Sequence, residues 1–141
     1  MSNFLILVLI LPLLSFLIIA SSGRLLGVYG SMILSVLNIA GALLVSVFLF
    51  FTISFDCSIY VPLWEWVILT EIPVSFGFRY DGLTAVMFLV VTTVSCCVHV
   101  YSCVYMYTDP FLARFMSYLS LFTFFMLVLV SSSNLLVLFL G

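Results

Sequence analysis

Four long stretches without a charged side chain constrain this chain more than any other feature of its sequence. They cover about residues 3–22, 28–54, 82–107 and 115–140. An α-helix rises about 1.5 Å per residue and the hydrocarbon core of a bilayer is about 30 Å thick, so about 20 apolar residues make one crossing. Lipid offers no hydrogen-bond partners to open backbone groups, which favours helices. The pattern predicts an all-α membrane protein with about four transmembrane helices in a single membrane domain, residues 1–141.

The scarcity of charge supports this fold class and excludes several functions. Charged residues make up 6% of the chain and hydrophobic residues 67%, whereas soluble domains carry about 25% charged residues. The formal net charge is −2, the pI is about 4.8, and there is no lysine. Nucleic-acid surfaces and polybasic lipid-binding segments need clustered Lys and Arg. We therefore expect neither of these, and we expect lipid to cover most of the surface.

The first stretch is predicted to remain as a helix. A cleaved signal peptide begins with a positively charged region, and no Lys or Arg precedes the apolar run here. Pro12 falls near the middle of the stretch, which predicts a kink that neighbouring helices can accommodate.

The long connection at about residues 55–80 has the period of a strand. Alternate residues from Ile72 to Tyr80 are apolar or aromatic, and those between them are small, polar, charged or proline. This period predicts a short β-hairpin between the second and third helices. We expect it on the membrane surface, with Trp64, Trp66 and Tyr80 in the interfacial aromatic belt. A hairpin that faces the aqueous phase fits the sequence equally well.

The arginines indicate an orientation. Arg24 and Arg114 fall in the two short connections, which lie on the same side of a four-helix arrangement. Arg79 lies in the otherwise acidic hairpin connection. By the positive-inside rule, Arg24 and Arg114 mark the matrix or cytoplasmic side. Both termini and the hairpin are then predicted on the opposite side.

His99 is the ionisable residue inside a predicted span, and it is a candidate proton-path residue for that reason. A neutral imidazole bonded to a neighbouring helix is the alternative, and the cost of intramembrane charge favours it. Cys96, His99 and Cys103 share one helix face. Structural zinc usually takes four ligands from paired motifs, so we expect no metal here. The four cysteines show no disulfide framework.

Other polar residues are assigned structural roles. Asp81 and Asp109 precede predicted helices, where a carboxylate can cap the first turn. The polar run Ser131–Asn134, which includes Ser132, lies inside the fourth predicted span. Cross-helix hydrogen bonding is favoured for it over a hydrated path.

Motifs for cofactors are absent from the sequence. It contains no G-x-G-x-x-G, P-loop, H-E-x-x-H or C-x-x-C pattern. No carboxylate or lysine lies inside a predicted span. We therefore expect no catalytic residue and no cofactor on this chain, and we do not expect it to conduct ions alone.

The second half of the chain resembles chain 5 of mitochondrial NADH:ubiquinone oxidoreductase, the antiporter-like subunit of complex I. The matching segments are Phe78–Thr84, Val98–Ser102, Tyr105–Met106, Asp109–Pro110, Arg114–Met116, Tyr118–Leu127 and Ser133–Gly141. The first 77 residues match only in layout, as two helices followed by a hairpin loop.

The resemblance implies a scaffold role in the membrane arm of a complex that oxidises NADH, reduces ubiquinone and translocates protons across the mitochondrial inner membrane. In this family, a tryptophan and a glutamate follow the glycine that corresponds to Gly141, and that glutamate and the lysines of later helices handle protons. None of them is on this chain. The resemblance therefore implies a split subunit, with a C-terminal fragment, other membrane-arm subunits and lipids as partners. Combined with the orientation that the arginines indicate, it makes the intermembrane space the expected side of both termini. Ser133 stands where the family often has an aspartate, which weakens a proton role there.

Two other functions stay open at this point. Similar helices occur in the large subunit of multi-subunit sodium/proton antiporters, although the block from Tyr101 to Leu127 favours the mitochondrial family. A purely structural membrane subunit would show the same spans.

Overall fold

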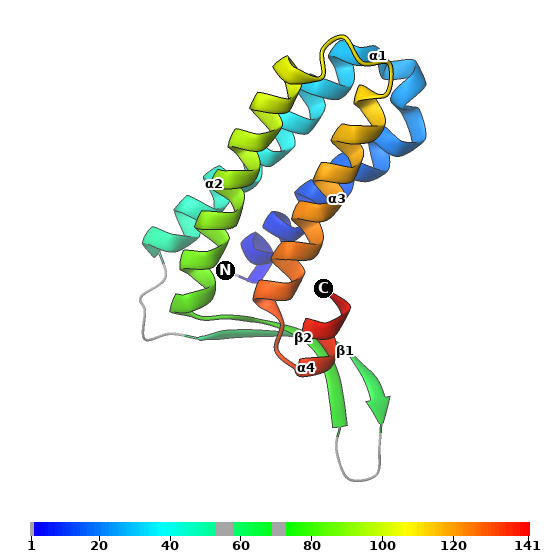
Figure 1. Cartoon of the computed structure of the whole chain (residues 1–141). Helices are drawn as coiled ribbons and strands as arrows, with labels where there is room; N and C mark the ends of the chain where they lie inside the picture. Colours follow the sequence, from blue (N-terminus) through cyan, green and yellow to red (C-terminus); the bar gives the residue numbers. More distant parts are fainter. Residues whose placement is uncertain (1, 53–57, 69–72) are drawn as a thin grey trace.

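The computed structural model describes residues 2–52, 58–68 and 73–141, and it shows a helical bundle with a β-hairpin at one end (Figure 1). The elements are α1 (Ser2–Thr52), β1 (Ile59–Ile68), β2 (Pro73–Tyr80), α2 (Gly82–Tyr105), α3 (Leu112–Ser131) and α4 (Leu135–Leu140).

Helix α1 supplies two membrane crossings. Its 51 residues correspond to about 75 Å of helix, more than twice the hydrocarbon thickness. The backbone leaves helical angles at Ser22 and Gly27, and the chain reverses direction there (Figure 1). Gly27 has φ +69°, a left-handed conformation that glycine adopts without steric cost. Pro12 keeps helical backbone angles, so the break lies ten residues beyond the position where we expected a kink.

Three helices of the described chain are long and apolar enough to cross a membrane: the folded α1, then α2 and α3. With the reversal in α1 they provide four crossing segments, which confirms the predicted fold class. α1 packs against both α2 and α3. We call the end with the α1 reversal and the α2–α3 connection the kink end, and the end with β1 and β2 the hairpin end (Figure 1).

The predicted hairpin is confirmed. β1 and β2 pair antiparallel, from Ile59 opposite Tyr80 to Ile68 opposite Pro73, with two irregularities in β1. Trp64 is exposed, and its ring stacks on Phe76 with centroids 4.7 Å apart. Tyr80, in contrast, is fully buried against Phe88 of α2, so its expected place in an interfacial belt is wrong. The side chain of Trp66 lies outside the part of the chain that the structure describes.

The fourth predicted helix, residues 115–140, is wrong at residues 132–134, where the helix is interrupted. α3 begins at Leu112 and ends at Ser131, and after an extended segment the chain forms the six-residue α4. Ser, Thr and Asn side chains compete with the helical backbone for hydrogen bonds. Here a better set of partners is available, because the open edge of β2 lies beside residues 132–134.

Residues 132–134 lie against β2. Phe78 and Ser132 form an antiparallel bridge. The Ser133 hydroxyl donates to the Gly77 carbonyl at 2.8 Å, and the Asn134 amide nitrogen donates to the Ser75 carbonyl at 2.8 Å. An exposed strand edge presents unpaired backbone groups, and this segment satisfies three residues of that edge.

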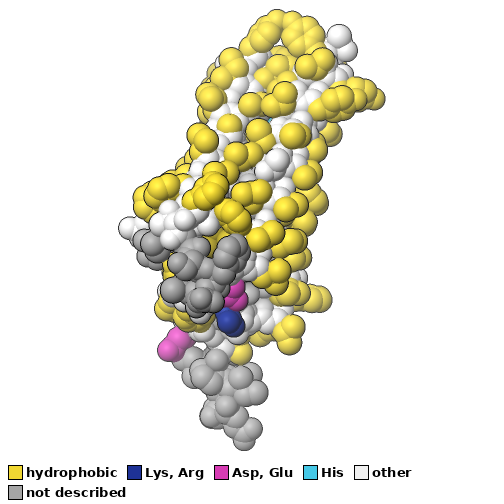
Figure 2. Space-filling model, turned by 90° about the vertical axis from the view of Figure 1, so that its left-hand side faces the viewer, with side chains coloured by type: hydrophobic (Ala, Val, Ile, Leu, Met, Phe, Trp, Pro, Cys, Tyr) yellow, Lys and Arg dark blue, Asp and Glu magenta, His cyan; other side chains and the backbone are white. Residues whose placement is uncertain are grey.

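The apolar residues divide between a core near the hairpin end and a large exposed surface. Leu5, Val8, Phe88 and Leu127 are among the fully buried core residues. On the face drawn in Figure 2, hydrophobic side chains cover the shaft of the bundle, and the charged side chains in view gather at the hairpin end. Such an apolar shaft with charge at its end is the surface expected of a membrane-embedded bundle.

Candidate functional site

The candidate site is a chain of polar side chains buried between the helices around His99. His99 is 1% exposed, and its Nδ1 lies 2.7 Å from the carbonyl oxygen of Ser95, one turn earlier in α2. A carbonyl oxygen only accepts hydrogen bonds, so Nδ1 carries a proton and donates it. In the neutral imidazole, Nε2 is then the acceptor.

On its other side, the imidazole meets α3 and α1. Nε2 lies 3.4 Å from the Ser120 hydroxyl, which also contacts the Ser15 hydroxyl at 3.2 Å and the Met116 carbonyl at 3.0 Å. A serine hydroxyl has one proton to donate. When Ser120 gives its proton to Nε2, Ser15 can donate to Ser120. When His99 is protonated, Nε2 donates to the Ser120 hydroxyl, and this hydroxyl then donates its own proton to the Met116 carbonyl.

A second branch ties the site together. The Ser95 hydroxyl lies 2.6 Å from the Thr123 hydroxyl of α3, and Thr123 contacts the Leu119 carbonyl at 2.9 Å. The five linked polar side chains of Ser15, Ser95, His99, Ser120 and Thr123 come from α1, α2 and α3. A separate buried pair, Ser46 and Thr92, joins α1 to α2 with hydroxyls 3.0 Å apart.

The surroundings of His99 favour the neutral form. It lies six residues from the end of α2, which is about 9 Å of helix rise. The described membrane-spanning helices contain no Asp or Glu. A charged imidazole would therefore have no acidic partner on these helices, and an unpaired charge at this depth is costly. The site can bind three helices together and hold a reversible hydrogen-bond chain, but on its own residues it holds no second titrating group.

The cysteines on the His99 face of α2 can be compared with the ligand set that a metal ion needs. Within the described chain, no three His, Cys, Asp or Glu residues are grouped so that they could hold a metal ion. Cys96 and Cys103 are half-buried, and both His99 nitrogens already have polar neighbours.

The two predicted caps differ from expectation. Asp81 occupies the residue before α2, but its carboxylate makes no capping hydrogen bond and pairs with Arg79 at 3.0 Å. Its backbone carbonyl accepts the Ala85 N–H. Asp109 accepts the Phe111 N–H at 2.9 Å in the turn before α3, whose first residue is Leu112. The Asp109 carboxylate therefore stabilises the turn between α2 and α3 and does not cap the first turn of α3.

The sequence did not indicate that the hydroxyl of Tyr80, at the hairpin end, is buried without a hydrogen-bond partner in the described part of the chain. The Tyr80 hydroxyl is buried and has no hydrogen-bond partner among the described residues. Burial raises the pKa of Tyr80 to about 12, because the phenolate cannot be solvated there. Alternation placed Tyr80 on the apolar side of a strand, and its burial comes from tertiary packing, which includes the Phe88 ring of α2.

Comparisons with known proteins match nearly the whole chain. Residues 66–116 match the family profile described as the N-terminus of NADH-ubiquinone oxidoreductase (complex I) chain 5. Chain 5 of Metridium senile is 44% identical over 142 residues, 96% of this chain and 23% of that protein. Chain 5 of Chondrus crispus is 45% identical, and that of Arabidopsis thaliana 42%, each over 96% of this chain and 21% and 20% of the relative.

The similarity is wider than the sequence motifs indicated. We expected the first 77 residues to match in layout alone, whereas the aligned regions cover 96% of the chain. The chain spans between a fifth and a quarter of the length of these relatives.

Proposed function

Because this chain is a relative of NADH-ubiquinone oxidoreductase chain 5 and matches its N-terminal part, we propose that it forms that part of the subunit within a respiratory complex I. The 44% identity to a chain 5 over 96% of the residues is the observation that carries this proposal. The complex would oxidise NADH, reduce ubiquinone and translocate protons across the mitochondrial inner membrane.

Within such a complex, the chain would act as a scaffold. Its described helices carry no carboxylate that could pass protons along the membrane plane. Their outward residues are large and apolar, such as Ile33, Leu44 and Phe122, each more than half exposed. These faces suit lipid or further helices. The four crossing segments and the hairpin would complete the subunit and shield its proton-handling residues from lipid.

We further propose that the rest of the subunit is a second polypeptide that packs on this one. The relatives are about four to five times as long as the part that this chain covers. Both termini lie toward the hairpin end (Figure 1), and the exposed apolar faces of the bundle are open to further helices.

Native electrophoresis of mildly solubilised membranes tests the main proposal. We expect this chain in the band that stains for NADH dehydrogenase activity. The peptides should be made with chymotrypsin, because the sequence has three Arg, no Lys and many Phe and Tyr. Recovery only from a complex without NADH oxidation would favour the sodium/proton antiporter, and recovery from neither would favour a structural subunit.

Denaturing electrophoresis of the same band tests the split. An antiserum against residues 112–131 should detect a species near 15.8 kDa. A single species several times larger would show one continuous chain 5, and would leave the membership in complex I untouched.

A further inference from the structure

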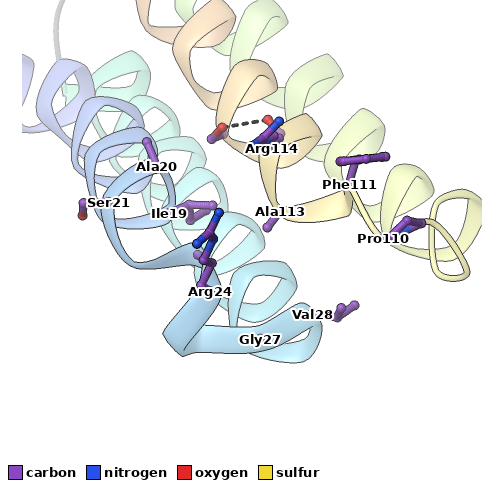
Figure 3. A pocket seen from close by; sticks show the side chains of 12 residues that line it. Ile19, Ala20, Ser21, Arg24, Gly27, Val28, Pro110, Phe111, Ala113 and Arg114 are labelled. Atoms are coloured by element: carbon purple, nitrogen blue, oxygen red, sulfur yellow. Dashed lines mark hydrogen bonds between the residues drawn. The ribbon is translucent and has the colours of Figure 1, made fainter.

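A cavity of about 550 Å³ lies at the kink end, between the reversal of α1 and the start of α3 (Figure 3). Its walls include Arg24, Gly27 and Val28 from the reversal and Phe111, Arg114 and Ser117 from the start of α3. Cavities that bind small molecules usually have a volume of about 300–1,000 Å³.

Two arginines from distant parts of the sequence line this cavity. Arg24 belongs to the reversal of α1 and Arg114 to the first turn of α3. Figure 3 shows Arg24 rising from the reversal toward that turn. Among the described residues, neither guanidinium has an acidic partner within ion-pair distance, and the one ion pair found there joins Arg79 to Asp81 at the opposite end.

Other groups at the cavity favour negative charge. Ala113 and Arg114 lie in the first turn of α3, where backbone N–H groups lack partners within the helix and the helix dipole is positive. The nearest acid in sequence, Asp109, is not part of the cavity wall, and its carboxylate is engaged by the Phe111 N–H. The Arg114 guanidinium lies 5.9 Å from the centre of the Phe111 ring, which helps to hold it at the cavity.

The location selects the class of anion. The cavity lies where the membrane-spanning helices end, which is the depth of phospholipid phosphates. Ile19 and Val28 add apolar wall beside the two guanidinium groups, so an acyl-bearing molecule is accommodated better than a bare ion. Arginine pairs with phosphate through two parallel hydrogen bonds.

We propose that this cavity binds the phosphate headgroup of an anionic phospholipid, with Arg24 and Arg114 as its two ligands. The proposal does not depend on the proposed function, because it uses only the geometry of the kink end. It also does not require a polybasic segment, since folding alone brings the two arginines together.

Lipid retention by the intact membrane protein tests the proposal. The complex that contains this chain is purified in detergent, stripped of loose lipid, and titrated separately with short-chain phosphatidylglycerol, phosphatidylcholine and inorganic phosphate. Bound lipid is counted by native mass spectrometry. We expect the double variant Arg24→Gln/Arg114→Gln to weaken phosphatidylglycerol binding at this chain at least tenfold.

Arg79→Gln is the control, because it makes the same type of substitution, at one arginine, at the hairpin end. It should leave phosphatidylglycerol binding within twofold. The variant Arg24→Lys/Arg114→Lys keeps both charges, and it separates the loss of charge from a general effect of substitution on the fold. It should bind more lipid than the Gln variant. Unchanged binding in the Gln variant, equal binding of phosphatidylcholine, or competition by inorganic phosphate at equal concentration would each overturn the proposal.

Discussion

At the scale of single residues, buried polar groups distinguish this chain from a plain apolar bundle. His99 has a donor bond to Ser95 and a weaker contact to Ser120, whereas the Tyr80 hydroxyl has no partner in the described structure. Cross-helix hydrogen bonds in membranes contribute about 0.6 kcal/mol on average. An unsatisfied buried hydroxyl instead costs about 1–3 kcal/mol. The two residues should therefore respond to substitution in opposite directions.

We expect His99→Ala to lower proton pumping modestly in reconstituted vesicles while the complex still assembles. The substitution removes the central member of the polar chain and leaves a small cavity, at a cost of about 1–3 kcal/mol. Thr92→Ala is the control, because it too removes a buried polar contact between two helices, in this case α1 and α2, but removes no titrating group. Equal pumping per assembled complex in the two variants would leave His99 with a packing role alone.

We expect Tyr80→Phe to stabilise the chain by about 1 kcal/mol at neutral pH, since it deletes an unpaired buried hydroxyl. The folded-state pKa of about 12 exceeds the unfolded value near 10. The free energy of unfolding of the wild type is therefore unaffected by this group below pH 10, and it falls as the pH rises from 10 to 12, because the unfolded state loses the phenol proton first. The difference in midpoint temperature between the variant and the wild type should widen from pH 8 to pH 11, and a constant difference would contradict the assignment.

At the scale of elements, two short segments shape the molecule. The reversal at Ser22–Gly27 divides one long helix into two crossings. Residues 132–134 end α3 and attach it to β2 through Gly77 and Ser75. In the first segment, Gly27 adopts a left-handed backbone conformation that ends the helix. In the second segment, side chains form hydrogen bonds with β2 that a continuous helix would not allow. Substitutions in each segment, compared with a control variant, test its contribution to stability.

The contact between residues 132–134 and β2 should be measurable. Ser133→Ala and Asn134→Ala each remove one hydrogen bond to β2, and each should cost about 1 kcal/mol. Hydrogen exchange of the Ser75–Phe78 backbone is the measurement, and it should accelerate. Ser132→Ala is the control, because Ser132 joins β2 through its backbone. Equal acceleration in the control would mean that the side chains do not hold the edge.

The reversal of α1 should depend on Gly27. At φ +69° an alanine is strained by about 1–2 kcal/mol, although no atom lies within 4 Å of the added Cβ. Gly27→Ala should therefore lower the thermal midpoint. Gly41→Ala is the matched control, since Gly41 is helical and its new Cβ would lie 3.7 Å from Leu11. The control should be neutral or stabilising, and the reverse order of the two midpoints would contradict the conformational argument.

At the scale of the whole molecule, the charges divide between two ends. Arg24 and Arg114 lie at the kink end, and the Arg79–Asp81 pair lies at the hairpin end. By the positive-inside rule we propose that the kink end faces the matrix and that the hairpin and both termini face the intermembrane space.

Single cysteines would report this sidedness. In a Cys57→Ser background, Glu65→Cys on the hairpin should react with a membrane-impermeant maleimide in mitoplasts. Leu25→Cys, at a side chain that is 90% exposed, should react only in inverted vesicles. The native cysteines of α2 lie within a membrane-spanning helix and provide the background. The opposite labelling pattern would invert the orientation.

Local patterns in the sequence were enough to establish the membrane class, the hairpin and its place between the second and third crossings. Charge-free length and the period of two are properties of neighbouring residues, so they need no knowledge of contacts. His99 was singled out for the same reason, by its position in an apolar run.

Contacts between distant residues decided the rest. Ser133 and Asn134 meet β2 across 56 and 59 residues of sequence, and Ser15 meets Ser120 across 105. The burial of Tyr80 and the cavity between Arg24 and Arg114 likewise depend on which helix lies beside which strand or turn. A polar run inside an apolar stretch has two outcomes, helix or strand edge, and only the presence of an open edge beside it selects one.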